Sequence, residues 1–340
     1  MSSEHKNNFY FDSRWVGEHG IGRFSFEIKK SKIANLSTNL LGNFSHIFSL
    51  LDPIKLSKIT LLKRAYFISP SYNTPAFGVD RAIITIHDLM HIKFNNYKRI
   101  KNIIYYNILV KRTCRKSPLV FTVSNFTKDE IAKWANIPKN KIVTIYNGVD
   151  KSFTPEAEPH KHNKPYLLYI GEKKPHKNLL RLINAYSRTI SAEKIDLLIS
   201  GTPNKELTAL IEELKLTKKI HFTGFIEESM LPSYYKGALA LLLPSLYEGF
   251  GLPIIEAMAV GTPVLTSNIT AMPEVAGGAA LLVDPYDIDS ISKGIDRIIS
   301  DHPLRNRLSF AGLERAKFFS WDKARNDWDN ALNSALGLEE

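Results

Sequence analysis

The sequence has little of what secreted or membrane-spanning proteins need. Its 340 residues include a single cysteine, Cys114, which excludes an internal disulfide and a cysteine-based zinc site. The longest uninterrupted apolar run, residues 237–244, is far shorter than the roughly 18 residues of a membrane-spanning helix. The first twelve residues, MSSEHKNNFYFD, are polar and have no apolar signal core, so we expect a cytoplasmic protein.

Charge is divided unevenly along the chain. Residues 1–150 hold 23 lysines and arginines against 10 acidic residues, whereas residues 151–340 hold 22 against 24. The net charge of +11 therefore arises entirely in the first half. This excess favours an anionic partner, such as a phosphate-bearing substrate or a membrane surface, with general solubility as the alternative. The basic and aromatic residues form no recognisable recognition module, so we expect no nucleic-acid partner.

Short apolar segments alternate with amphipathic ones along most of the chain, which is typical of α/β proteins. The apolar segments have no polar face, which predicts parallel strands covered by helices on both sides. The proline-containing polar segment 150–165 separates residues 1–150 from residues 151–319. We therefore expect two doubly wound Rossmann-like domains facing each other across a cleft. The predicted strands are 8–12, 65–69, 82–87, 119–124, 141–146, 166–170, 196–200, 220–225, 238–243, 263–266 and 280–283, and the predicted helices are 22–35, 99–116, 127–135, 178–190, 205–216, 253–259, 287–300 and 304–318.

The densest functional signal is PSLYEGFGLPIIEAMA, which follows a predicted strand. Gly249 and Gly251 allow the backbone to approach a ligand closely, and the helix that follows favours phosphate oxygens at its N-terminus. Glu248 lies in the loop and Glu256 in the first turn of the helix, where carboxylates can accept hydrogen bonds from sugar hydroxyls. Taken alone, Glu248 is explained by exposure to solvent and Glu256 by a favourable interaction with the helix dipole. Together, on both sides of Phe250 and its glycines, they favour a sugar-nucleotide site.

A second loop, GEKKPHKN, also joins a predicted strand to a predicted helix. Lys173, Lys174 and Lys177 cluster where the strand ends. Ammonium groups at such a position suit a diphosphate, although solvation is the usual explanation of clustered lysines. The position of the loop favours contact with a ligand, most of all for Lys177.

In the first half, the glycine-rich loop GEHGIGR follows the first predicted strand. Gly20 and Gly22 permit close approach of the backbone to a ligand, and a tight structural turn is the alternative. The spacing differs from the dinucleotide pattern G-x-G-x-x-G, so no nicotinamide cofactor is expected. His87 ends another predicted strand; it can exchange a hydrogen bond with a substrate hydroxyl or serve structurally.

No metal site is expected from the D-x-D strings of the sequence. Asp287 and Asp289 begin a predicted helix, where acidic side chains interact favourably with the helix dipole. Asp327 and Asp329 lie within a helix, where side chains two residues apart point in different directions. Neither pair is predicted to bind a metal ion.

Taken together, these segments resemble the retaining glycosyltransferases of family 4, also called glycosyl transferases group 1, which have the two-domain GT-B fold. The most specific element is EGFGLPIIE, from Glu248 to Glu256, which matches the E-x7-E motif of that family. The resemblance covers nearly the whole chain in the expected order and is closest to bacterial enzymes that build O-antigen and other surface polysaccharides. Further elements are GIGRF (20–24), HDL (87–89), VSNFTKDEI (123–131), IYNGVD (145–150), PHKN (175–178), TGF (223–225) and FSWDKAR (319–325).

The resemblance assigns roles to residues of the segment PSLYEGFGLPIIEAMA (244–259), which we call the glutamate loop. Glu256 would bind the nucleotide ribose, and Glu248 would bind the donor sugar. The amides of Gly249, Phe250 and Gly251 would approach the sugar and the diphosphate.

The loop GEKKPHKN (171–178), which we call the lysine loop, would hold the diphosphate. By resemblance, Lys177 would neutralise the leaving group with the help of a second cation. The family often has arginine directly after the glycine of this loop, but Glu172 stands there in this chain. Lys173 or Lys174 would then supply the second positive charge.

The resemblance also gives the first domain a share in the site. His87 would contact the donor sugar near the reacting carbon, and the loop from Gly20 to Gly22 would line the phosphate or acceptor side. The C-terminal helix, residues 320–336, would pack back on the first domain.

The implied reaction moves a sugar from a nucleotide-sugar donor to a glycan or lipid-diphosphate-linked acceptor, with retention of the anomeric configuration through front-face attack. No enzyme nucleophile is evident, and we expect no metal ion or cofactor to be required. The PHKN loop favours GDP-mannose, and hence a mannosyltransferase of O-antigen-type lipopolysaccharide biosynthesis. A UDP- or dTDP-sugar donor is the alternative, and a sugar-nucleotide epimerase with the same fold is the rival function.

The basic first half fits a domain that meets a lipid-linked acceptor at the inner face of the cell membrane. Within the predicted helix 99–116, apolar residues lie between basic ends, so this helix is a candidate for insertion among lipid headgroups. Its apolar residues cover more than one face, so burial in the domain core is the alternative. The basic residues are Lys98, Arg99, Lys101, Lys111, Arg112, Arg115 and Lys116.

Overall fold

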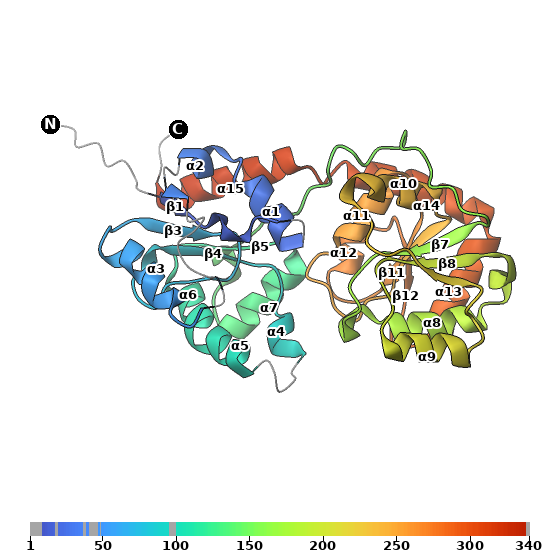
Figure 1. The fold of residues 1–340 in the computed structure, drawn as a ribbon. Coiled ribbons are helices and arrows are strands. Elements are labelled where there is room, and N and C mark those ends of the chain that lie inside the picture. The colour runs from blue at the N-terminus through green and yellow to red at the C-terminus, as the bar shows by residue number, and fades with distance from the viewer. Residues whose placement is uncertain are drawn as a thin grey trace. The chain divides into compact units, whose positions relative to one another are not determined.

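The computed structural model describes residues 9–17, 20–36, 39–40, 47, 49–94 and 100–337. The chain divides into two compact units, each built on a parallel sheet covered by helices (Figure 1). Unit 1 comprises residues 1–148 and 321–340, and unit 2 comprises residues 149–320. No helix among the described residues is both long and apolar enough to cross a membrane.

The sheet of unit 1 has six parallel strands in the order β2-β1-β3-β4-β5-β6. Its central strand β4 is buried along its whole length, as expected for a strand with helices on both faces. All predicted strands of this half are found at their predicted positions, except that Asn8 lies outside the described residues. The short β2 was not predicted. The strands are β1 (Phe9–Phe11), β2 (Asn39–Leu40), β3 (Tyr66–Ser69), β4 (Ala82–Ile86), β5 (Val120–Thr122) and β6 (Ile142–Thr144).

Helix α7 of unit 1 has a clear signal at each end. At the start of α7, the Ser124 hydroxyl accepts a hydrogen bond from the Thr127 amide, and the helix stops at Asn136, which has a φ of 54°. The predicted helix 22–35 is divided into α1 and α2, and α4 was not predicted. Helix α3 was not predicted either, because its apolar residues do not gather on one face. The helices are α1 (Gly20–Ile28), α2 (Lys32–Leu36), α3 (Asp52–Leu61), α4 (Met90–Lys93), α5 (Ile100–Tyr105), α6 (Lys111–Lys116), α7 (Asn125–Ala135) and α15 (Trp321–Leu336).

The C-terminal helix α15 packs on α1 of unit 1 although about 300 residues separate them. The Trp328 ring stacks on Phe121 of β5 with ring centroids 3.8 Å apart. The Asp329 carboxylate accepts hydrogen bonds from the amides of Lys32 and Ile33 at the start of α2. Asp329 is therefore used at a helix N-terminus, where a carboxylate is favourable.

Unit 2 has six parallel strands in the order β12-β11-β10-β7-β8-β9. Every residue of β7, β8, β10 and β11 is buried, and Ala185, Leu182 and Ile295 from the covering helices pack in the same core. The predicted strand 220–225 is shorter than expected because Gly224 has a φ of 73° and turns the chain. The strands are β7 (Tyr166–Tyr169), β8 (Asp196–Ile199), β9 (Ile220–Phe222), β10 (Ala240–Leu243), β11 (Val264–Ser267) and β12 (Leu281–Val283).

The helices of unit 2 match the predicted ones, with two additions. The short helices α10 and α12 were not predicted, because each has only one or two turns; in both, the second residue is a proline. The helices are α8 (Leu179–Arg188), α9 (Lys205–Glu213), α10 (Leu231–Gly237), α11 (Leu252–Ala259), α12 (Met272–Ala276), α13 (Ile288–Ser300) and α14 (His302–Ala316).

Candidate active site

The strand order of unit 2 marks one place on its sheet. Strand β7, the first of the unit, pairs with β8 on one side and with β10 on the other. Helical connections from these two neighbouring strands therefore run in opposite directions, which is the topological switch point of a doubly wound sheet. Ligands of such sheets bind outside the carboxyl ends of the strands at this point. The lysine loop follows β7 and the glutamate loop follows β10, so both predicted loops lie there.

The side chains of Lys177 and Glu248 meet at this switch point. The Lys177 ammonium donates to both carboxylate oxygens of Glu248, over 2.8 and 2.9 Å. The Ser245 hydroxyl donates to the same carboxylate over 2.8 Å. The side chains of Lys177 and Glu248 are 19% and 11% exposed. Glu248 is thus held in an ion pair rather than solvated, and both groups stay within reach of a ligand.

Asn178 fastens the lysine loop to its neighbours. Its side-chain amide donates to the carbonyls of Pro244 and Pro285, over 2.8 and 2.7 Å. Its backbone has a φ of 63°, a left-handed conformation that asparagine tolerates better than most residues. The Leu246 amide also donates to the carbonyl of His176, over 2.7 Å. Asn178 was not predicted as a site residue, although it ends the PHKN element (175–178) and directly follows Lys177.

His176 lies buried beside the ion pair, with 5% of its surface exposed. Burial, and then the nearby Lys177 ammonium, lower the pKa of His176 to about 4. Its imidazole is therefore neutral at neutral pH. The burial of His176 could not be predicted, because a histidine between a proline and a lysine is equally compatible with an exposed loop.

The low pKa of His176 predicts a pH-dependent stability. Below pH 6.5, the ordinary pKa of histidine, His176 is protonated in the unfolded chain but stays neutral in the folded chain until about pH 4. The contribution of His176 to the free energy of unfolding is therefore fully present above pH 6.5 and is lost as the pH falls toward 4. We expect His176→Asn to remove about 2 kcal/mol of the stability difference between neutral pH and about pH 4.5. Urea unfolding followed by circular dichroism at both pH values measures it. The exposed His302→Asn serves as the control, and equal pH dependence of wild type and His176→Asn would contradict the prediction.

Glu256 lies deeper than the sequence predicted. It is the fifth residue of α11 and so lies in the second turn, not in the first, because the helix begins at Leu252. The helix dipole, which acts within the first turn, does not explain a carboxylate there. Glu256 is only 5% exposed, and the buried Tyr235 hydroxyl donates to it over 2.8 Å. A buried carboxylate held in this way is suited to a specific acceptor role.

The glycines of the glutamate loop shape the N-terminus of α11. Gly251 precedes the helix with a φ of 101°, a conformation that side chains rarely adopt. Phe250 is buried, and its ring meets Phe319 edge-on with centroids 5.7 Å apart. The segment from Gly249 to Gly251 therefore leads into α11 next to the ion pair. Contact of its amides with a sugar or a diphosphate stays a prediction.

The structure does not bring Lys173 and Lys174 to the ion pair. The Lys173 ammonium donates to the carbonyl of Ser200 over 3.0 Å, at the end of the neighbouring strand β8. Lys174 pairs with Glu172 over 2.5 Å, and both side chains are largely exposed. Which of the two lysines supplies a second cation toward a diphosphate stays open.

In unit 1, the predicted loop from Gly20 to Gly22 is instead the first turn of α1, so the loop interpretation is wrong for these residues. A side chain at Gly22 would clash with the backbone of Gly17, which explains the glycine by packing within the chain. His87 follows β4, and its Nε2 donates to the carbonyl of Pro70 over 2.8 Å. Its ring also meets Phe24 edge-on. These contacts hold His87 in place, and its contact with a donor sugar stays a prediction.

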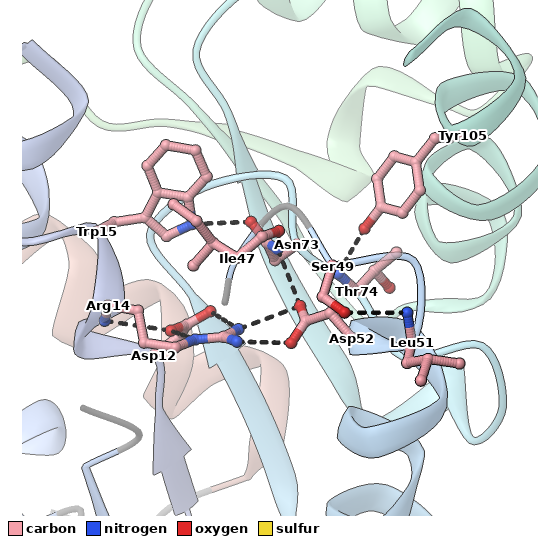
Figure 2. A network of polar contacts seen from close by, with 10 residues as sticks. All are labelled: Asp12, Arg14, Trp15, Ile47, Ser49, Leu51, Asp52, Asn73, Thr74 and Tyr105. Atoms are coloured by element: carbon pink, nitrogen blue, oxygen red, sulfur yellow. Dashed lines mark hydrogen bonds and ion pairs between the residues drawn. The ribbon is translucent and has the colours of Figure 1, made fainter. Parts of the chain in front are cut away.

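The carboxyl ends of β1 and β3 in unit 1 carry a buried polar network (Figure 2). The Arg14 guanidinium donates to Asp12 over 2.7 Å and to Asp52 over 2.6 Å, and all three side chains are at most 3% exposed. Asn73 donates to Asp52 and accepts from the Trp15 indole. Burial raises the pKa of Asp12, against the lowering effect of Arg14. Because Arg14 is enclosed by its partners, we interpret the network as stabilising the fold of unit 1. The network was not predicted from the sequence.

The geometry of unit 2 defines a class of protein. A Rossmann-like sheet with a lysine and a carboxylate at its switch point, in front of a helix N-terminus, can hold a phosphorylated sugar compound through charge and hydrogen bonds. A second parallel α/β unit with its own sheet completes the architecture of GT-B glycosyltransferases.

Comparison with known proteins identifies the family. The model of glycosyl transferases group 1 matches residues 150–315, and the model of glycosyltransferase family 4 matches residues 24–153. The chain is 33% identical over 278 residues to O-antigen chain mannosyltransferase B of Escherichia coli, covering 76% of this chain and 73% of the relative. It is 34% identical over 222 residues to O-antigen chain mannosyltransferase RfbU of Salmonella typhimurium, covering 63% and 60%. The chain therefore belongs to glycosyltransferase family 4.

Solved structures agree on the fold. Sucrose-phosphate synthase from Thermosynechococcus elongatus superposes with a TM-score of 0.78 at 17% identity, over 98% of this chain and all of the other. WaaG, a glycosyltransferase involved in lipopolysaccharide biosynthesis, gives a TM-score of 0.75 at 14% identity, over 97% of this chain and all of WaaG. The predicted GT-B fold and the predicted family are thus confirmed.

Proposed function

We propose that this protein transfers mannose from GDP-mannose to a glycan or lipid-diphosphate-linked acceptor in O-antigen-type polysaccharide synthesis, with retention of configuration and without a metal ion. The observation that carries the proposal is the ion pair of Lys177 and Glu248 at the switch point of unit 2. Two relatives with mannosyltransferase names, both above 30% identity, support the choice of sugar.

The side chains divide the work of the reaction. As the bond between sugar and diphosphate breaks, negative charge grows on the departing phosphate. The ammonium of Lys177 has three protons, two of which go to Glu248, so the third can meet a phosphate oxygen without loss of the pair. A preplaced cation of this kind lowers the barrier because it needs no reorganisation as charge develops. Glu248 would accept from a hydroxyl of the donor sugar, and Glu256 from the ribose.

A panel of donors tests the proposal. A ligand that binds only the folded state raises its melting temperature, so we expect GDP-mannose to stabilise the protein more than UDP- or dTDP-sugars do. Transfer to an oligosaccharide acceptor should then require GDP-mannose, persist in chelator, and give a product whose anomeric configuration, read by NMR, equals that of the donor. Preference for a UDP- or dTDP-sugar would replace the donor. Epimerised sugar nucleotide formed without an acceptor would identify the rival activity.

We also propose that unit 1 meets the anionic inner face of the cell membrane. Ile100, Ile104 and Ile108 are 48%, 52% and 61% exposed. Ile100 and Ile104 share one face of α5 at a spacing of four, and Ile108 lies in the π-helical turn Tyr106–Val110 that follows. Tyr106 and Val110 are buried in the core of the unit. The segment 100–110 therefore packs on the core and also exposes apolar side chains to solvent.

Charge around this outward face suits anionic lipid. Residues 100–116 contain no acidic residue. Of the predicted basic residues, Lys101, Arg112, Arg115 and Lys116 are exposed, whereas Lys98 and Arg99 lie outside the described residues. A polybasic surface beside exposed apolar side chains is the combination that binds lipid headgroups.

Vesicle flotation tests the membrane proposal. We expect the full chain to float with vesicles that contain anionic phospholipid at low salt, less at high salt, and not with neutral vesicles. Ile104→Glu should weaken flotation because it places a charge in the apolar face. Ile190→Glu, at an exposed position in unit 2, is the matched control and should float like wild type. Absence of flotation at low salt, or equal flotation of the two variants, would discard the proposal.

A further inference from the structure

A cluster of two histidines and one aspartate lies in unit 2, outside the site described above. The Nε2 atoms of His162 and His221 lie 2.8 and 3.1 Å from the same oxygen, Oδ2 of Asp196. One ligand atom from each of the three residues lies within 4.8 Å of the other two. Among the residues that the structure describes, this is the one group of three such side chains with metal-ligand spacing.

The cluster lies at the amino ends of the strands, whereas the ion pair lies at their carboxyl ends. Asp196 is the first residue of β8, and His162 lies four residues before β7, so both mark the amino ends of strands. Lys177 and Glu248 follow the carboxyl ends of β7 and β10. The proposed transfer reaction therefore makes no use of the cluster.

The chemistry of the cluster favours a metal ion over a plain ion pair. Two imidazole nitrogens and one carboxylate oxygen are a common ligand set for zinc and its neighbours, with a further position left to water. Zinc bound at about 2.0–2.1 Å from each ligand of a tetrahedral site would hold each imidazole nitrogen slightly farther from Oδ2 of Asp196 than it is here. Small side-chain rotations would suffice, because His162 and His221 are 19% and 39% exposed.

The surroundings of Asp196 leave one of its oxygens to the histidines. Lys164 lies 3.4 Å from the other oxygen, Oδ1, and is half exposed. Its ammonium can stay there while Oδ2 turns to a metal ion, or move into solvent. Asp196 itself is only 6% exposed and is fixed by its place in β8, so it gives the site a rigid anchor.

We propose that His162, Asp196 and His221 bind one divalent transition-metal ion of the zinc class. The ion ties the segment before β7, which connects the two units in sequence, to the sheet of unit 2. Its role is structural: it stabilises unit 2 and takes no part in sugar transfer.

Zinc titration of the tag-free, chelator-stripped full chain tests this proposal. We expect calorimetric binding of one equivalent at neutral pH. Scanning calorimetry should show a higher melting temperature for unit 2. All four tryptophans belong to unit 1, so the transition reported by tryptophan fluorescence should not move. Cobalt should give visible absorption bands of a low-coordinate site.

Ligand variants decide whether the three residues form the site. His162→Gln and His221→Gln should each abolish the zinc effect and the cobalt bands while the stripped proteins remain folded and active. His302→Gln, which changes an exposed histidine outside the cluster, should bind zinc like wild type. The proposal is overturned if no saturable one-equivalent binding is seen, or if binding persists in the double variant His162→Gln/His221→Gln.

Discussion

Lys177→Ala is expected to lower kcat/KM for sugar transfer by roughly 100- to 1,000-fold, the usual effect of losing one preorganised charge donor, about 2.7–4 kcal/mol. The loss has two physical causes. The departing diphosphate loses its cation, and Glu248 is left as an uncompensated carboxylate next to a developing negative charge. Steady-state kinetics with saturating acceptor measure the change, and the melting temperature shows that the variant is folded.

Lys174→Ala is the comparison variant for this prediction, and it also tests whether Lys174 supplies the second cation toward a diphosphate. Lys174 lies three residues away in the same loop, but it pairs with exposed Glu172 rather than with the carboxylate of the site. We expect it to change kcat/KM by less than about threefold, as for a solvated surface pair. Equal losses in both variants would show that the loop needs positive charge in general. Full activity of Lys177→Ala would remove Lys177 from the mechanism.

Arg14→Met is expected to lower the free energy of unfolding of unit 1 by about 3–5 kcal/mol, because it leaves two buried carboxylates without their cation. Asp12 and Asp52 both depend on Arg14 in the network of Figure 2. Denaturant unfolding followed by tryptophan fluorescence measures unit 1 specifically, since unit 2 contains no tryptophan.

Two further variants separate charge from packing in this network. Arg112→Met, at an exposed position in the same unit, should change stability by less than about 0.5 kcal/mol. Asp12→Asn and Asp52→Asn added to Arg14→Met should recover part of the loss, because neutral amides need no cation. A stability of Arg14→Met equal to that of wild type would show that the buried pairs do not hold unit 1 together.

Much of the fold could be predicted because local patterns determine it. Apolar segments without a polar face predicted strands such as β4 and β10 within a few residues, and the predicted helix 253–259 starts one residue after α11 does. Short elements such as β2 and α12 were missed, because they have too few residues to show a period. Gly20 and Gly22 were interpreted as a loop, although the predicted helix 22–35 already began at Gly22, since glycine is as compatible with a helix start as with a turn.

The site itself depends on contacts that no local pattern contains. Lys177 and Glu248 are 71 residues apart and meet only because β7 and β10 are neighbours in the sheet. Asn178 reaches a carbonyl 107 residues away, and Tyr235 meets Glu256 inside the core. The loops could be named from the sequence, but their pairing required the order of the strands.

The most direct test of the central claim is a crystal structure of the protein with GDP-mannose bound. The account predicts a diphosphate oxygen within hydrogen-bond distance of the Lys177 ammonium, the sugar beside Glu248 and the ribose beside Glu256. A nucleotide bound away from all three side chains would contradict it.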